Sequence, residues 1–375
     1  MGENESEMIR VLHYAPGFNS GGIESRLLDW YRNIDRTKIK FSLLKLNQID
    51  DSNSLTEFRQ MGGEYYNLPP MNINNIIEYV KKLSRFFKDN KFDIIHVHDL
   101  STGIFVLYAA KRAGIKCRIL HSRTTDYLPN EKNLLIKKVL KSVTPLFATD
   151  YFACSYEAGV WGIGERKADL VKVVKNGIQI DKFHFSANQR NNIRSILKVE
   201  NKFVIGAIGR LSPQKNLMFL LDIFNELQHK HDDAVLLLIG EGSMRSEIEK
   251  KIKDYRLQDK VFLLGEQRDV WNYYMAFDVF VGTSYYEGFG TTAIESQAVG
   301  TPTVLSTGFP GIVCISDYVS RLDINSNKEI WIDTIVNYKD VRFSNESIEL
   351  VERHGYSAYS VAKDLELYYM SNSKK

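Results

Sequence analysis

The chain has 375 residues, of which 44% are hydrophobic and 25% are charged, a composition typical of a globular protein of two or three domains. A formal net charge of only +3 argues against a protein that coats nucleic acid. Three widely spaced cysteines argue against a disulfide framework, and no cysteine–histidine cluster has zinc-binding spacing. The first residues lack the regions of a signal peptide, and no apolar run reaches the roughly 20 residues of a membrane-spanning helix. We therefore expect a cytoplasmic protein.

The first half of the chain alternates short β-rich runs with helical stretches. Several of these runs are continuously apolar, as in strands that are covered on both faces of a parallel sheet. This alternation predicts a doubly wound βαβ sheet. The predicted strands are Ile9–Tyr14, Lys40–Leu46, Ile94–His98, Cys117–His121 and Tyr151–Ser155, and the predicted helices are Ile23–Asn33, Asn72–Asn90 and Thr102–Ala113.

The same pattern restarts in the second half. Its predicted strands are Phe203–Ile208, Ala234–Ile239, Val261–Leu264, Val279–Gly282 and Pro302–Ser306, and its predicted helices are Leu217–His229, Ser243–Tyr255, Val270–Ala276 and Thr292–Ala298. We therefore predict an α/β protein with two Rossmann-like doubly wound domains that face a central cleft, residues 1–177 and 178–355. A last helix in 356–375 is expected to pack back across the junction.

Ligands of open α/β sheets bind beside the carboxyl ends of the strands, so the loops after the strands carry the functional candidates. After the first strand, Gly21 and Gly22 precede a helix whose N-terminal N–H groups can bind an anion. A tight turn without a ligand explains the same glycines. The loop is not a P-loop, because Ile23 stands at the position of its lysine, and it lacks the dinucleotide-binding glycine pattern of a dehydrogenase.

In the second half, Arg210 and Lys215 follow the first predicted strand. A guanidinium offers a bidentate fork and an ammonium offers a point charge, a combination that suits a diphosphate. From position alone, a solvated basic loop is an equally good interpretation.

The segment from Thr283 to Glu295 contains a strand end, Glu287, a glycine loop and a helix start. The N–H groups of the loop and helix N-terminus form a second candidate anion site. Glu295 lies one turn inside the helix, where its carboxylate can accept hydrogen bonds from ribose hydroxyls. Glu287 can bond sugar hydroxyls. Two acids alone could arise by chance, but this order of elements is specific.

These motifs together resemble the family 4 glycosyltransferases, which are retaining enzymes of GT-B architecture, from about Ile9 to Met370. The stretches around His96 and His121 are most similar to exopolysaccharide and capsule glycosyltransferases. The landmarks are Gly21-Gly22-Ile23-Glu24, Asn176-Gly177-Ile178, Gly209-Arg210-Leu211 with Lys215-Asn216, Ile239-Gly240-Glu241-Gly242, Gly265 with Asp269-Val270, and Glu287-Gly288-Phe289-Gly290 with Glu295.

The resemblance implies catalytic roles for four residues. Arg210 and Lys215 match the cations that bind the donor diphosphate and neutralise charge on the departing nucleotide. Glu287 matches a residue that contacts the donor sugar, and His121 matches a histidine that faces this sugar and can donate a hydrogen bond to it. A strand-end histidine with a backbone partner is the alternative for His121. No Asp-x-Asp motif follows a strand, so we expect neither a metal nor a cofactor.

The remaining implied contacts divide between donor and acceptor. Glu295 matches the residue that holds the ribose, and Gly22 matches the glycine that lets the backbone approach the diphosphate. The donor is further anchored by the loop amides of Gly288, Phe289, Gly290 and Thr291. Gly21, His98 and Arg123 are weaker candidates for binding the acceptor. Arg123 in particular departs from the His-Ser-His pattern of relatives. His96 and His98 alternate along one strand, so we expect only one of them to face the ligand.

The resemblance implies retaining transfer from a nucleotide-diphosphosugar, most commonly a UDP-sugar, to a hydroxyl of a glycan or lipid-linked saccharide in bacterial surface polysaccharide synthesis. A nucleotide-sugar epimerase of the same fold is one alternative, and it needs acid and base groups in the cleft. A non-catalytic partner of GT-B fold is the other. The family signature at Glu287–Glu295 disfavours the epimerase, and the presence of Arg210, Lys215, Glu287 and Glu295 counts against the non-catalytic partner.

One basic stretch suggests a further partner. Residues 101–150 hold nine basic and three acidic side chains, and Lys132–Ser142 within them is amphipathic. Such a helix can lie on an anionic membrane, at the inner face of the cell membrane in this case. The alternative is an ordinary surface helix that buries Leu135, Val139 and Leu140.

Overall fold

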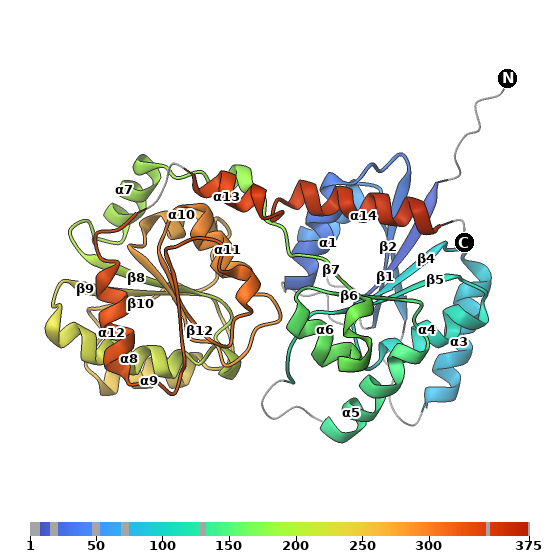
Figure 1. Ribbon diagram of the computed structural model, residues 1–375, viewed down its shortest axis with the longest axis horizontal. Coiled ribbons are helices and arrows are strands. Elements are labelled where there is room, and N and C mark those ends of the chain that lie inside the picture. Colours follow the sequence, from blue (N-terminus) through green and yellow to red (C-terminus); the bar gives the residue numbers. More distant parts are fainter. Residues whose placement is uncertain are drawn as a thin grey trace. The chain divides into compact units, whose positions relative to one another are not determined.

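The computed structural model describes residues 8–15, 22–46, 53–68, 75–127, 133–342 and 346–373. The chain divides into two compact units, each with its own parallel sheet (Figure 1). Unit 1 contains Met1–Thr125, Glu131–Gly177 and Ala358–Lys375, and unit 2 contains Asp126–Asn130 and Ile178–Ser357. The cleft that the sequence predicts stays a prediction.

The sheet of unit 1 has the strand order β3-β2-β1-β4-β5-β6-β7, and every neighbouring pair is parallel. The order reverses between β1 and β4, which is where open α/β sheets bind ligands. The strands are β1 (Ile9–Tyr14), β2 (Ile39–Leu46), β3 (Glu64–Leu68), β4 (Ile94–Val97), β5 (Cys117–Ser122), β6 (Asp150–Ala153) and β7 (Val171–Val173). The helices are α1 (Gly22–Asn33), α2 (Asn53–Gln60), α3 (Ile76–Asp89), α4 (Gly103–Arg112), α5 (Leu134–Val143), α6 (Tyr156–Ile163) and α14 (Ala358–Asn372).

The sheet of unit 2 has the order β10-β9-β8-β11-β12-β13, again all parallel, and it reverses between β8 and β11. The strands are β8 (Phe203–Ile208), β9 (Ala234–Ile239), β10 (Val261–Leu263), β11 (Val279–Gly282), β12 (Thr303–Ser306) and β13 (Val319–Leu322). The helices are α7 (Ala187–Ile196), α8 (Leu217–Lys230), α9 (Arg245–Asp254), α10 (Val270–Ala276), α11 (Thr291–Ala298), α12 (Lys328–Asn337) and α13 (Ser347–Arg353). The predicted class, two Rossmann-like doubly wound α/β domains, is confirmed.

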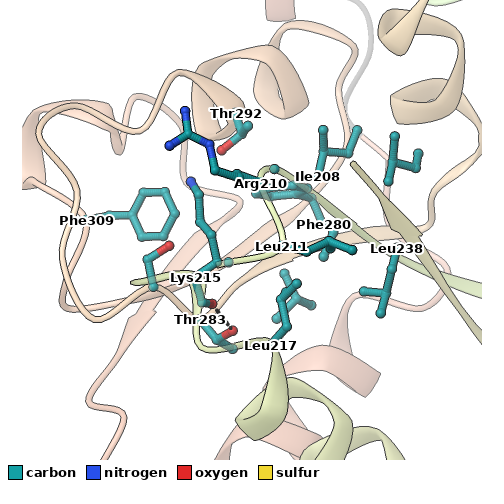
Figure 2. Close-up of a pocket in the computed structure, with 16 residues that line it drawn as sticks. Ile208, Arg210, Leu211, Lys215, Leu217, Leu238, Phe280, Thr283, Thr292 and Phe309 are labelled. Atoms are coloured by element: carbon teal, nitrogen blue, oxygen red, sulfur yellow. Dashed lines mark hydrogen bonds between the residues drawn. The ribbon is translucent and has the colours of Figure 1, made fainter. Parts of the chain in front are cut away.

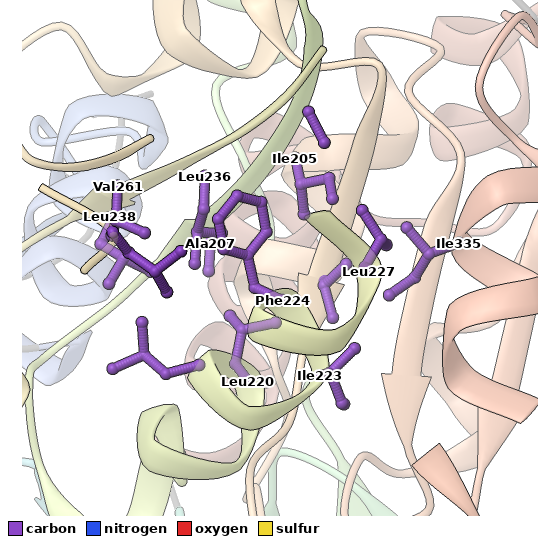
Figure 3. Close-up of a cluster of buried hydrophobic side chains, with 14 of the residues drawn as sticks. Ile205, Ala207, Leu220, Ile223, Phe224, Leu227, Leu236, Leu238, Val261 and Ile335 are labelled. Carbon is purple, nitrogen blue, oxygen red and sulfur yellow. The ribbon is translucent and has the colours of Figure 1, made fainter. Parts of the chain in front are cut away.

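Periodicity explains how α8 is anchored on this sheet. Leu220, Ile223, Phe224 and Leu227 recur at helical spacing and are buried against side chains of β8 and β9 (Figure 3). Burial of each such side chain contributes about 1.5–3 kcal/mol. The N-terminus of α8 is therefore held firmly beside the carboxyl end of β8, where the sequence predicts the donor site.

The C-terminal helix α14 belongs to unit 1. It runs beside α1 in Figure 1, and its residues Val361, Leu365 and Tyr369 join the core cluster that includes Leu27 and Trp30 of α1. The last helix in the chain therefore completes the core of the first sheet.

Candidate functional site

A pocket in unit 2 lies at the carboxyl ends of β8 and β11, where the strand order reverses. Figure 2 shows that the side chains of Arg210 and Lys215 extend in the same direction in this pocket, towards the hydroxyl of Thr292. Arg210 is exposed and Lys215 is half-buried. The structure thus brings the two cations together on the segment after β8, where Lys215 ends a short 3-10 helix (Pro213–Lys215).

Close backbone packing shapes the loop that carries Arg210. Gly240 has a φ of 133°, and a Cβ atom at this position would lie 2.1 Å from the carbonyl oxygen of Gly209. Only glycine allows this approach, which lets the N–H of Leu211 donate to the carbonyl of Glu241 at 2.9 Å. The Gly-Glu-Gly landmark therefore holds the loop after β8 in place.

Lys215, which lines the pocket, forms an ion pair with Glu287. The Lys215 Nζ lies 2.6 Å from Glu287 Oε1, and the two side chains are only 19% and 10% exposed. The hydroxyl of Ser284 donates to the same oxygen at 2.7 Å. The carboxylate and the ammonium, predicted from separate motifs, are therefore in direct contact.

Three further hydrogen bonds join the loops that carry this pair. The N–H of Tyr285 donates to the carbonyl of Gln214 at 2.9 Å, and the Gln214 side-chain amide donates to the carbonyl of Tyr286 at 2.9 Å. The Thr283 hydroxyl donates to the carbonyl of Lys215 at 3.1 Å (Figure 2). The two loops therefore form one unit that presents Lys215 and Glu287 in a fixed geometry.

The glycine loop before α11 is tightly packed. Gly288, Phe289 and Gly290 are buried, and Gly290 has a φ of 88°, with the Phe309 ring so close that a Cβ would lie 2.4 Å from it. α11 begins at Thr291, so its first N–H groups lie at the end of this loop. The segment therefore has the form of an anion site at a helix N-terminus.

A hydrogen bond from helix α10 orients Glu295, which lies on α11. The Tyr274 hydroxyl donates to Glu295 Oε2 at 2.8 Å. Burial, together with the negative charge of Glu295, holds the pKa of Tyr274 well above its ordinary value. Tyr274 therefore stays a donor and fixes one oxygen of the carboxylate. The sequence analysis overlooked this tyrosine, because it lies outside every recognised motif.

The glycine loop of unit 1 is described only in part. Gly21 lies outside the described residues. Gly22 begins α1, and a Cβ atom added to it would have no described atom within 4 Å. Glu24, in the first turn of α1, is a residue to which the sequence analysis gave no role. It is 2% exposed, and neither carboxylate oxygen has a partner among the described residues. A buried acid beside a glycine loop is a functional candidate, and its place in the Gly-Gly-Ile-Glu motif was the available signal.

Four buried histidines gather at the strand ends of unit 1: His13, His96, His98 and His121. His13 Nδ1 lies 3.1 Å from His98 Nε2, and His96 Nε2 lies 2.9 Å from His121 Nδ1. Burial, with some repulsion from Arg123, lowers the pKa of His13 to about 3. Burial likewise holds the pKa values of the other three well below the ordinary value. All four rings are therefore neutral at physiological pH.

The expectation that only one of His96 and His98 faces the ligand side is wrong. Their rings stack at a centroid distance of 4.4 Å. Side chains two residues apart along a strand leave the same face, so the alternation argument was misapplied. His121, on the neighbouring strand β5, contacts His96 within the same cluster.

Arg123 lies on the histidine cluster. Its Nε donates to His98 Nδ1 at 3.1 Å, its Nη1 donates to Asn176 Oδ1 at 3.2 Å, and its guanidinium lies 4.9 Å from the ring centroid of Trp30. Burial lowers the pKa of Arg123 to about 10. The arginine is therefore a half-buried cation that the His98 and Trp30 rings and Asn176 hold in place.

Among the described residues, His13, His96 and His98 are the one group with ligand atoms close enough to hold a metal ion, all within 4.8 Å of one another. His13 and His98 already share a hydrogen bond through His98 Nε2. Arg123 donates to the other ring nitrogen of His98, Nδ1. A divalent ion would lie beside that guanidinium without a compensating carboxylate. The donor set therefore fits a neutral hydrogen-bond network better than a metal centre.

Helix α5 coincides with the predicted basic amphipathic stretch, but no residue in it is buried. Leu135 is 78% exposed, Val139 is 62% exposed and Leu140 is half-buried. The alternative of an ordinary surface helix that buries Leu135 and Val139 is therefore wrong. Across the described ranges, no helix is long and apolar enough to cross a membrane.

Comparison with solved structures places the fold among glycosyltransferases of the GT-B class. The chain superposes on Anabaena Alr3699/HepE in complex with UDP-glucose with a TM-score of 0.77 at 20% identity, covering 97% of this chain and 100% of that one. It superposes on a glycosyltransferase from Rickettsia africae ESF-5 with a TM-score of 0.79 at 17% identity, covering 98% and 100%. At these identities the likeness establishes the fold.

Two family models match consecutive parts of the sequence: "Glycosyltransferase Family 4" over residues 20–182 and "Glycosyl transferases group 1" over residues 188–329. The chain is 30% identical to the "Putative glycosyltransferase EpsF" of Bacillus subtilis strain 168, over 98% of both chains. It is 27% identical to an Escherichia coli UDP-Gal:alpha-D-GlcNAc-diphosphoundecaprenol alpha-1,3-galactosyltransferase, over 75% of this chain and 78% of the relative. The chain belongs to the family 4 glycosyltransferases.

Proposed function

We propose that this glycosyltransferase moves a sugar from a nucleotide-diphosphosugar, a UDP-sugar in the first instance, to a hydroxyl of a glycan or lipid-linked saccharide with retention of configuration. The observation that carries the proposal is the pocket at the ends of β8 and β11, where Arg210 and Lys215 lie together beside Glu287. A pair of cations in a pocket at a sheet's reversal point suits a diphosphate.

In this proposal the donor is bound by unit 2. Arg210 and Lys215 bind the diphosphate and neutralise the charge that grows on the leaving phosphate. The amides of Gly288–Thr291 and the start of α11 add further donors to the anion. Glu295, held by Tyr274, accepts hydrogen bonds from the ribose hydroxyls. Glu287 orients Lys215 and bonds a hydroxyl of the donor sugar.

The reaction needs no metal ion in this scheme, because fixed cations supply the electrostatic stabilisation. The acceptor hydroxyl attacks from the face that the nucleotide leaves, and the departing phosphate takes the acceptor proton. Unit 1 binds the acceptor, with Gly21, His98 and Arg123 as the contributing residues, while Gly22 and His121 contact the donor, as the family resemblance implies. Glu24 adds an acceptor for a substrate hydroxyl in the same unit.

We further propose a role in bacterial surface polysaccharide synthesis on the cytoplasmic side of the membrane. Relatives of this chain include the Escherichia coli galactosyltransferase whose acceptor is a diphosphoundecaprenol-linked sugar and the capsular polysaccharide biosynthesis glycosyltransferase CapH of Staphylococcus aureus.

A donor panel with a lipid-linked saccharide acceptor tests the proposal. We expect sugar transfer from a UDP-sugar, and we expect this activity to persist when a metal chelator is added. The anomeric configuration of the product, measured by NMR, is expected to equal that of the donor. An inverted linkage would exclude the retaining mechanism. Conversion of the nucleotide-sugar to an epimer without transfer would favour the epimerase alternative, and binding without any turnover would favour the non-catalytic one.

The exposed face of α5 supports docking on an anionic lipid surface. Leu135 and Val139 offer apolar area to the acyl boundary, while Lys138 is exposed and Lys137 half-exposed beside them. Lys141 already donates to the carbonyl of Trp161 at 2.7 Å and lies over that ring, so its stem helps to hold α5 on unit 1. The most exposed of these charges is that of Lys138.

We expect the double variant Leu135→Ser/Val139→Ser to bind vesicles containing anionic lipid at least 10-fold more weakly, since each buried apolar side chain contributes about 1.5–3 kcal/mol. Vesicle flotation with zwitterionic and anionic lipids measures the effect. The matched control is Ile196→Ser, which changes a 66% exposed apolar residue on α7 of unit 2. Equal flotation of the double variant and the wild type would contradict docking through α5.

A further inference from the structure

The four histidines of unit 1 form two hydrogen-bonded pairs. In each pair, one histidine accepts a hydrogen bond from a further side chain. Arg123 begins the pair His98–His13, and Tyr369 of α14 begins the pair His96–His121. Since a neutral imidazole carries one N–H, the direction of the first hydrogen bond determines every later one along its pair.

The direction of the first pair is certain, because arginine can only donate. Arg123 Nε donates to His98 Nδ1, so the single proton of His98 is on Nε2. His98 Nε2 then donates to His13 Nδ1 at 3.1 Å, which places the proton of His13 on its own Nε2. Among the described residues this Nε2 is buried and has no partner.

The second pair follows from the phenol of Tyr369. This side chain is fully buried, and burial holds its pKa well above the ordinary value, so it keeps its proton. Within the described part of the chain, His96 Nδ1, at 2.7 Å, is the acceptor available to that proton. The reverse direction would leave a buried hydroxyl proton unpaired, which native folds avoid.

With its Nδ1 accepting from Tyr369, His96 carries its proton on Nε2 and donates to His121 Nδ1 at 2.9 Å. His121 is therefore protonated on Nε2. This atom, too, is buried without a partner among the described residues. A buried imidazole N–H needs an acceptor, which an ordered water or an oxygen atom of a ligand can supply.

We propose that Tyr369, on the C-terminal helix α14, is a positioning residue that holds His121 in the Nε2–H tautomer through His96, so that His121 donates a hydrogen bond to an oxygen of the sugar in the nucleotide-sugar. The inference rests on the proposed function for the identity of the ligand. It gives the last helix of the chain a chemical role in unit 1 beside its packing role.

Histidine-selective ¹⁵N labelling tests the tautomers directly, because the chain has only eight histidines. We expect the wild-type protein, without ligand, to show Nε2 of His121 as a protonated nitrogen and Nδ1 as a bare one. The variant His121→Gln identifies the signals by their loss. A wild-type spectrum with the His121 proton on Nδ1 would overturn the proposal whatever the enzyme's activity.

The variant Tyr369→Phe removes only the oxygen that begins the second pair. We expect both His121 nitrogen signals to move towards values averaged between the tautomers, and kcat/KM for transfer to fall roughly 10- to 100-fold, as when an outer partner of a functional histidine is removed. Affinity for UDP, which has no sugar to contact, is expected to stay within 2-fold, on the order of experimental scatter. Unchanged His121 signals and unchanged transfer would overturn the proposal.

The neighbouring tyrosine provides a matched control. Tyr368 donates to Asp150 Oδ1 at 2.5 Å, so Tyr368→Phe also deletes one hydrogen-bonded hydroxyl from α14 but leaves both histidine pairs intact. We expect it to leave the His121 tautomer unchanged. An equal change in both variants would mean that α14 acts only through packing.

The same spectra separate this inference from the proposed function. Addition of a UDP-sugar that is a substrate is expected to shift His121 Nε2, whereas UDP alone shifts it less. If no UDP-sugar binds or reacts while His121 remains protonated on Nε2 and responds to Tyr369→Phe, the relay stands and the proposed donor fails. If transfer occurs but the His121 proton is on Nδ1, the proposed function stands and the relay fails.

Discussion

Replacement of Lys215 by alanine is expected to lower kcat/KM for the nucleotide-sugar about 100- to 1,000-fold, the usual cost of removing one preorganised group that stabilises developing charge. The structure adds a second reason. Glu287 is only 10% exposed and pairs with Lys215, so the variant would leave a buried carboxylate in the pocket that is to hold an anion. Repulsion between Glu287 and the diphosphate would then add to the lost attraction.

Titration calorimetry with UDP measures the loss of diphosphate binding. Steady-state kinetics of transfer measure the fall in kcat/KM. The matched control is Lys251→Ala, because Lys251 is 18% exposed, pairs with Asp222 at 2.6 Å in the same unit and does not line the pocket. The double variant Lys215→Ala/Glu287→Gln is expected to recover part of the UDP affinity, since it removes the negative charge that Lys215 no longer balances. Full UDP affinity in Lys215→Ala would remove this lysine from the diphosphate site.

Replacement of Glu287 by glutamine is expected to lower kcat/KM for transfer about 10- to 100-fold without weakening the binding of UDP. The reason is that hydrogen bonds to a charged group contribute about 1.5–3 kcal/mol, and the donor sugar would lose one. UDP has no sugar in that position, and it would meet a Lys215 ammonium that no carboxylate neutralises any longer.

Competition between UDP and the UDP-sugar measures this difference. Glu226→Gln, which removes a carboxylate paired with Lys328 on the outer helices of unit 2, controls for the change in net charge. If UDP affinity falls in Glu287→Gln as far as transfer does, Glu287 acts by holding the Lys215 loop and has no separate contact with the sugar.

The sequence analysis missed three strands, and all three lie at edges of their sheets. β3, β7 and β13 are outermost strands, and most of their residues are half-exposed or exposed. A strand buried on both faces needs a continuous apolar run, and β8 and β9 carry such a run. An edge strand faces water along one side, so its sequence resembles that of a loop.

The sequence by itself determined the doubly wound α/β class, the repeat of two sheets and the donor motifs. These features depend on periodicity and on residues within a few positions of one another, which local sequence records directly. It also located the basic stretch at α5. What it could not show was that Leu135 and Val139 of this helix remain exposed, because exposure depends on whether another element covers the face.

The tertiary structure decided which of the candidate groups meet. Lys215 and Glu287 are 72 residues apart and form one ion pair, and His96 and Tyr369 are 273 residues apart and share one hydrogen bond. Such contacts depend on the strand order of a parallel sheet and on the return of α14 to unit 1. Neither leaves a periodic signal, so these contacts, and the histidine tautomers that depend on them, emerged only from the packed fold.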